Sequence, residues 1–169
     1  MTREQLEAIA EDPKAFLRRG YKITGRISAK RERIAFWREQ AESITGRLKQ
    51  DGGAGACGYV ESPVANAVAE IITLEEHIGL EIQRLVHVER EVSEAINLLL
   101  ADPRHVALME MRYVNQFRLE EVAVRLGYAF RWAQRLHGKA LQKMKEAALS
   151  ALDSRYNGSI EKSKEPPEL

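Results

Sequence analysis

The chain has 169 residues, of which 26 are Lys or Arg and 25 are Asp or Glu, so its formal net charge at pH 7 is +1. This length allows one globular domain, or a small domain joined to an extended helical part, and excludes anything larger. The single cysteine, Cys57, excludes an intramolecular disulfide, and no Cys or His stands near it at metal-ligand spacing.

The charge is distributed unevenly along the chain. Basic and acidic residues number 12 and 7 in residues 1–50, 3 and 11 in 51–111, 8 and 2 in 112–145, and 3 and 5 in the remainder. The net charges are therefore +5, −8, +6 and −2. A short segment at +6 suits a polyanion such as DNA, although a merely solvated basic face would give the same count.

No segment of the sequence is expected to enter a membrane. The N-terminal residues MTREQLEAIAEDPK lack an apolar signal core, and no apolar run approaches the roughly 20 residues that span a bilayer. Together with the single cysteine, this predicts a cytoplasmic protein without a membrane partner.

Two long heptad patterns predict two long helices. The first pattern alternates steps of four and three, with Gly20 and Lys30 as its exceptions. It comprises Phe16, Gly20, Ile23, Ile27, Lys30, Ile34, Trp37, Ala41, Ile44 and Leu48. The second pattern comprises Val64, Val68, Ile71, Glu75, Ile78, Ile82, Leu85, Glu89, Val92, Ile96 and Leu99.

The segment between the two patterns cannot continue a helix. Four glycines occur in DGGAGACG, within a predicted loop 51–61, and Ser62 and Pro63 then resemble an N-cap and a first helical residue. We therefore expect an antiparallel helical hairpin over residues 1–101 that serves assembly or partner contact. A third helix of the same chain could cover its apolar face, but we favour a second copy, in a homodimer or higher oligomer.

A second domain is predicted over residues 102–156. Asp102 and Pro103 repeat the cap-and-proline signal and begin the helix PRHVALMEMRYV, which ends before a turn at Asn115 and Gln116. Residues 157–169 are polar and contain prolines, so we expect a disordered tail. No strand-like alternation occurs, and the predicted fold class is all-α.

The stretch LEEVAVRLGYAFRWAQRLHGKAL, residues 119–141, meets the demands of a helix-turn-helix. Such a motif needs inward apolar positions, a small residue at the helix crossing and a turn residue that tolerates positive φ. Ala123 is the small residue and Gly127 is the turn residue. The inward positions are Val122, Leu126, Tyr128, Ala133 and Leu136, and the preceding helix supplies Val106, Met109 and Tyr113 as a third apolar face.

The second helix of this motif, predicted over residues 129–146, would enter the DNA major groove. If Ala133 and Leu136 face inward, Arg131, Gln134 and Arg135 lie on the opposite face and are the candidate base-reading residues, since Arg pairs with guanine and Gln with adenine. The candidate phosphate contacts are Arg118, Arg125, Lys139 and Lys143.

Three residues of this predicted helix, Phe130, His137 and Gly138, allow more than one interpretation. Gly138 costs a helix about 1 kcal/mol relative to Ala, so a close backbone or phosphate approach would explain it. His137 could bond a phosphate or serve as a structural histidine, and Phe130 could touch a thymine methyl group or belong to the core.

The residues MEMRYVNQFRLEEVAVRLGY and RLHGKALQKM resemble region four of bacterial sigma factors, in which an RY-containing helix precedes the motif. Over most of its length, including SPVANAVAEIITLEEHI, the chain is similar to small phage and prophage proteins of Gram-positive bacteria. The resemblance implies a phage-encoded transcriptional regulator in the cytoplasm of a bacterial host. The family usually has Ser or Thr as helix caps, whereas Arg118 and Ala129 stand at those places here.

Two alternative functions remain open at this point. One is a small terminase subunit, which also joins a helix-turn-helix to oligomerising helices and marks viral DNA for packaging. The other is a sigma-like module that binds RNA polymerase without reading DNA.

Catalysis, cofactors and metals find no support in the sequence. The glycine-rich loop is not followed by the Lys-Ser or Lys-Thr of a phosphate-binding loop. The histidines, His77, His87, His105 and His137, show no metal-ligand spacing, and nothing places a base beside Cys57. We therefore expect a protein that is not an enzyme and binds no metal or cofactor.

Overall fold

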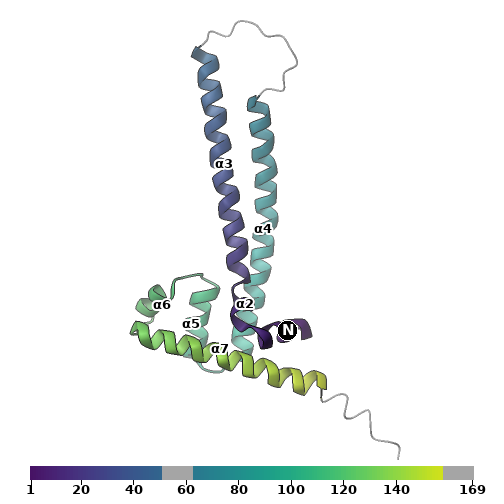
Figure 1. Ribbon diagram of the computed structural model, residues 1–169, viewed down its shortest axis with the longest axis vertical. Coiled ribbons are helices and arrows are strands. Elements are labelled where there is room, and N and C mark those ends of the chain that lie inside the picture. The colour runs from purple at the N-terminus through teal and green to yellow at the C-terminus, as the bar shows by residue number, and fades with distance from the viewer. Residues whose placement is uncertain (51–62, 158–169) are drawn as a thin grey trace, which may run out of the picture. The chain divides into compact units, whose positions relative to one another are not determined.

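The computed structural model describes residues 1–50 and 63–157. All regular secondary structure in these two ranges is helical, which confirms the predicted all-α class (Figure 1). The whole of the predicted glycine-rich loop 51–61, with Cys57, and the Ser62 cap lie outside the described residues, as does the predicted tail from residue 158 onward.

Within residues 1–50 and within residues 63–157, short connections join successive helices. In chain order they are α1 (Arg3–Glu11), α2 (Pro13–Leu17), α3 (Arg19–Gln50), α4 (Pro63–Leu99), α5 (Pro103–Tyr113), α6 (Leu119–Arg125), α7 (Phe130–Leu152) and a π-helical turn (Asp153–Asn157).

Helices α1 and α2 begin at side-chain caps. Thr2 and Gln5 form a reciprocal capping box, in which each backbone N–H donates to the other side chain, at 2.9 and 3.2 Å. Asp12 accepts from the amides of Lys14 and Ala15 and opens α2 in the same way. The heptad patterns leave α1 unpredicted, although the T-x-x-Q spacing is the usual sequence signal for such a start.

The structure divides into two compact units, which do not follow the predicted division at residue 101. One unit comprises Met1–Tyr21 and the chain from His87 onward, and the other comprises Lys22–Val86. The start of α3 and the end of α4 therefore belong with the C-terminal helices, whereas α3 from Lys22 onward and α4 up to Val86 form a separate helix pair.

The first unit has one continuous core that reaches from α1 to α7. Leu6 and Ile9 of α1, Ile96 of α4, Leu108 of α5 and Met144 of α7 are each no more than 1% exposed. Helix α7 continues to Leu152, beyond the predicted end at residue 146, because Met144 and Ala148 carry its buried stripe onward against α1. The predicted domain 102–156 thus shares its core with the N-terminus.

In the second unit, α3 and α4 run antiparallel side by side (Figure 1). Arg26 pairs with Glu81 at 3.0 Å and Arg38 with Glu75 at 3.2 Å, so residue numbers rise along α3 as they fall along α4. The first heptad pattern is confirmed from Gly20 to Ile44 of α3, since every one of its positions in this range is buried or half-buried. The side chain of Leu48 lies outside the described residues.

The second heptad pattern, which predicts the inward positions of α4, is wrong at every second position in this unit. Val68, Glu75 and Ile82 are exposed, and the preceding residues Ala67, Leu74 and Glu81 are buried instead. Apolar residues occupy both faces of α4, so periodicity alone allows either choice. The partner helix decides it, because Arg26 and Lys30 of α3 supply cations within 3.5 Å of Glu81 and offset the cost of burying its carboxylate.

The shared core makes a specific prediction about Ile9. Ile9→Ala removes a fully buried side chain opposite α7, and we expect the free energy of unfolding of the first unit to fall by about 2–4 kcal/mol. Urea denaturation followed by the fluorescence of Trp132 measures the change. An unfolding midpoint equal to that of the unchanged chain would show that α5–α7 fold without α1.

Candidate nucleic-acid interface

The predicted start of α5 is confirmed. Asp102 adopts extended backbone and accepts from the amide of Arg104 at 2.9 Å, and Pro103 occupies the first helical position. The expected third apolar face is also present, with Met109 and Tyr113 buried and Val106 partly buried.

Arg112 fixes the connection between α5 and α6. Its Nη1 donates to the hydroxyl of Tyr21 at 2.6 Å and to the carbonyl of Phe117 at 2.7 Å, and the Tyr21 hydroxyl also donates to the carbonyl of Arg112. The turn includes Gln116 at φ 57°, a conformation that non-glycine residues rarely adopt. No sequence pattern links Tyr21 to Arg112, because 91 positions separate them.

The turn between α6 and α7 is a Schellman motif. The amide of Tyr128 donates to the carbonyl of Ala123 at 2.8 Å, and the amide of Gly127 donates to the carbonyl of Val124 at 3.1 Å. Gly127 has φ 68°, as expected of the turn residue. This geometry ends α6 sharply and directs the chain into α7.

The inward positions of α6 and α7 are occupied as the sequence predicts. Val122 and Ala123 are at most 2% exposed, and Ala133 and Leu136 are also buried. Leu126 and Tyr128 are half-buried against the same core, and the Tyr128 ring meets the Trp132 ring edge-on, with centroids 4.1 Å apart. These contacts set which side of α7 faces solvent.

The candidate base-reading residues come together on that solvent side. Arg131, Gln134 and Arg135 are all exposed and line a single surface hollow. None of their side chains makes a hydrogen bond or ion pair with another described residue. Phe130, at 39% exposed, lies at the start of the same helix and is not a core residue.

Neither helix of the pair has a side-chain cap, as the sequence indicates. At the start of α6, the side chain of Arg118 accepts no hydrogen bond, and its backbone amide donates to the Glu121 carboxylate at 2.9 Å. Ala129 provides no cap for α7, and the amides of Phe130 and Arg131 find no acceptor among the described residues. Two N–H groups at the positive end of the helix dipole thus stay available to an anion.

The candidate phosphate contacts are all exposed and border this helix pair on different sides. Arg118 and Arg125 lie at the two ends of α6, and the guanidinium of Arg125 rests on the Phe117 ring at 4.0 Å. Lys139 and Lys143 lie on α7 close enough to His105 of α5 that their charges help to lower its pKa. The structure therefore orients Arg125 on an aromatic ring, and the other three residues are exposed.

His137 is half-buried and packs against Tyr113 of α5. Its Nε2 lies 2.9 Å from the hydroxyl of Tyr113, and the two rings stack with their centroids 5.8 Å apart. Burial, reinforced by the charges of Arg112 and Lys14, lowers the pKa of His137 to about 4. The imidazole is thus neutral at pH 7 and holds α7 against α5.

His105, unlike the half-buried His137, is fully buried, and the sequence predicted no role for it. It is 3% exposed, and neither ring nitrogen has a hydrogen-bond partner among the described residues. Burial lowers its pKa despite the nearby carboxylate of Asp102. Its position at the third residue of α5, after a clear cap, was a usable signal for an inward side chain.

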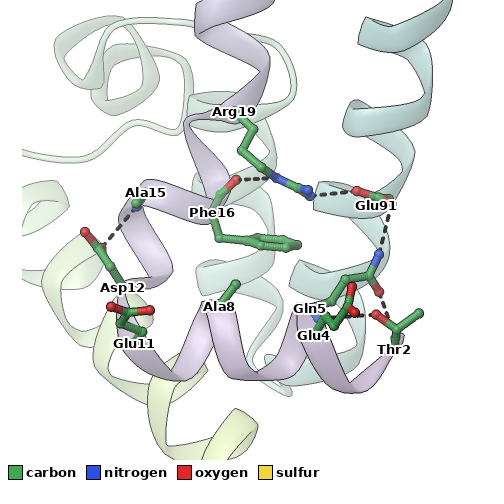
Figure 2. A pocket seen from close by; sticks show the side chains of 10 residues that line it. All are labelled: Thr2, Glu4, Gln5, Ala8, Glu11, Asp12, Ala15, Phe16, Arg19 and Glu91. Atoms are coloured by element: carbon green, nitrogen blue, oxygen red, sulfur yellow. Dashed lines mark hydrogen bonds and ion pairs between the residues drawn. The ribbon is translucent and has the colours of Figure 1, made fainter.

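A different hollow, of about 750 Å³, lies among α1, α2, Arg19 and Glu91 (Figure 2). Arg19 stacks on the Phe16 ring at 3.9 Å and donates to Glu91 at 2.8 Å, and Gln5 donates to the same carboxylate at 2.9 Å. The acidic residues of its lining are Glu4, Glu11, Asp12 and Glu91. This hollow would repel phosphate, and its polar groups tie α1 and α3 to α4.

Comparisons with protein-family models, curated proteins and solved structures found no match to this chain. Among residues 1–50 and 63–157, no helix is long and apolar enough to cross a membrane. The same residues contain no cluster of His, Cys, Asp or Glu that could hold a metal ion.

Two glycines of this region should respond in opposite ways to the same substitution. Gly127→Ala forces an L side chain into a positive φ and should lower the free energy of unfolding by about 1 kcal/mol. Gly138→Ala lies within α7 in open space and should raise it by up to about 1 kcal/mol. Thermal unfolding of both variants checks the assignment, which a stabilising Gly127→Ala would contradict.

The pKa of His137 predicts a loss of stability in mild acid. The folded-state pKa is about 4 and lies below the value of 6.5 for an unperturbed histidine, so the unfolded chain binds more protons between these pH values. Stability is complete above pH 6.5 and decreases as the pH falls towards 4. We expect His137→Gln to have a flatter stability profile than the unchanged chain in urea titrations at pH 7 and pH 5; parallel profiles would contradict the assignment.

Proposed function

We propose that this protein is a sequence-specific DNA-binding transcriptional regulator of the phage type that its sequence resembles. In this proposal α6 and α7 are a helix-turn-helix supported by α5, the first half of α7 enters the major groove, and the α3–α4 hairpin serves assembly. The observation that carries it is the convergence of Arg131, Gln134 and Arg135, free of other partners in the described chain, on one exposed face of α7.

The chemistry of this face suits base recognition. An Arg guanidinium donates two hydrogen bonds to the major-groove edge of guanine, and a Gln amide matches the donor and acceptor of adenine. Positions 131, 134 and 135 fall within about one turn of helix, so their side chains would reach neighbouring base pairs. The rigid Schellman turn and the small buried residues of α7 keep this face in a defined orientation.

The surrounding groups suit the DNA backbone. The free amides of Phe130 and Arg131 favour a phosphate oxygen at the start of α7, where a Ser or Thr cap would have competed for them. Arg118, Arg125, Lys139 and Lys143 add cations around the same helix pair. Such contacts would increase affinity and its salt dependence without selecting a sequence.

The base-reading role is tested by selecting binding sites from random double-stranded DNA. We expect the unchanged chain to enrich a defined site, and Arg131→Ala/Gln134→Ala/Arg135→Ala to lose discrimination between this site and random DNA. Each lost bidentate contact should weaken the specific complex about 5- to 100-fold. The control Arg84→Ala/Arg90→Ala removes the same number of positive charges, two, from α4 and should keep the preference for the selected site.

Two results of this selection experiment would contradict the proposal. An unchanged chain that enriches no site, or a triple variant that keeps the site preference, would contradict base reading by α7. Co-purification with RNA polymerase at a salt concentration that removes DNA would then favour the polymerase-binding alternative.

The phosphate contacts are tested by salt dependence. The variant Lys139→Ala/Lys143→Ala should keep the selected sequence but reduce the slope of log K against log salt by about 0.9 for each lost contact. Fluorescence anisotropy over a range of salt concentrations measures it. An unchanged slope would show that these two lysines are only solvated.

A further inference from the structure

Helix α4 exposes a second apolar face beside the one that packs on α3. Val68, Ile72, Ile82 and Val86 are 46%, 52%, 41% and 51% exposed, respectively. With Glu75 and Gly79 they follow one another in steps of four and three, which is the spacing of a helix–helix contact. This outer face extends about 27 Å along α4, and within the described hairpin nothing covers it.

The outer face has the same apolar pattern in both directions. It reads Val, Ile, Glu, Gly, Ile, Val, and its midpoint is level with His77. A second α4 in antiparallel orientation would therefore place Val68 opposite the partner's Val86, and Ile72 opposite the partner's Ile82. Such self-complementarity is what a two-fold symmetric contact requires, because each residue pair then occurs twice.

The polar positions favour the antiparallel orientation over the parallel one. Parallel helices would bring the two Glu75 carboxylates together, and like charges at an interface are costly. Antiparallel helices place Glu75 opposite the partner's Gly79, which has room for it. An added Cβ at Gly79 meets nothing within 4 Å in the hairpin, so the hairpin itself gives no reason for a glycine that costs its helix about 1 kcal/mol.

The charges at the border of this face are also incomplete in one copy. Arg31, Arg38 and Glu75 line one hollow together with Ile34 and Ile78. Arg38 pairs with Glu75 at 3.2 Å, and Arg31 has no ion pair among the described residues. In a single copy, two guanidinium groups at this border face one carboxylate. A second copy would add another carboxylate.

We infer that the outer face of α4, defined by Val68, Ile72, Glu75, Gly79, Ile82 and Val86, binds the same face of a second copy in a two-fold symmetric antiparallel contact. This inference does not depend on DNA binding and is tested without DNA.

The first test measures the mass of the full-length chain in solution. Sedimentation equilibrium should give a dimer, and Ile72→Lys should raise the dimer dissociation constant by about 100-fold or more, because the substitution acts twice in each dimer. Leu80→Lys is the matched control, since Leu80 is 54% exposed on the same helix but lies off the outer face. Its dissociation constant should stay within a few-fold of that of the unchanged chain.

Three outcomes of this measurement would overturn the inference. They are a monomer at all concentrations, equal effects of Ile72→Lys and Leu80→Lys, and a ring of eight or more subunits, which a closed two-fold contact cannot build by itself. The substituted side chains are exposed in a single copy, so circular dichroism should show unchanged helix content in both variants.

The second test determines the orientation of the two helices by disulfide formation in a Cys57→Ser background. Ile72→Cys/Ile82→Cys should form a covalent dimer on mild oxidation, because position 72 of each copy faces position 82 of the other across the antiparallel contact. Ile72→Cys alone should not, since the two copies of residue 72 would lie about 15 Å apart. Cross-linking of the single variant with the same yield would show a parallel contact and overturn the inference.

Discussion

The structure of the first unit depends on covering the buried stripe of α7 along its whole length. Ala133, Leu136, Ala140, Met144 and Ala148 form this stripe, and all of them are buried. Helices α5 and α6 cover the first half, and α1 packs along the rest. A stripe that is mostly alanine brings its neighbours close, so small changes in any of them would shift the helix.

The orientation of α7 determines its exposed chemistry. With the alanine stripe inside, helical periodicity leaves Arg131, Gln134 and Arg135 outside, and the Schellman turn at Gly127 fixes where the helix begins. Arg112 adds a bond network that holds the preceding connection to Tyr21 and Phe117. The proposed recognition face is thus oriented both by neighbouring residues of α7 and its turn and by the distant Tyr21, in keeping with the need to hold base-reading side chains rigidly.

Local signals in the sequence predicted much of this fold. The Asp102–Pro103 cap, the turn glycine at 127 and the inward positions of α6 and α7 are short-range features, and the structure contains each of them. The heptad pattern of α3 was also predictable, because only one face of this helix is apolar. Helix α4 carries two apolar faces, and the choice between them depends on the basic residues of α3, which no pattern within α4 reveals.

The remaining misses involve contacts between distant segments. Packing of α1 on α7 and the Arg112–Tyr21 bond join elements far apart in the chain, so periodicity could not indicate them. For the candidate site, helical spacing identified the exposed residues of α7 correctly. Their role in reading DNA stays a proposal that only binding measurements can test.

The most direct measurement of that role is a map of backbone amide chemical shifts as the chain is titrated with its selected DNA site. The proposal predicts the largest changes from Phe130 to Gly138 of α7 and at Arg118, with little change in the acidic hollow around Glu91. Changes confined to other helices, or none at saturating DNA, would contradict recognition by α7.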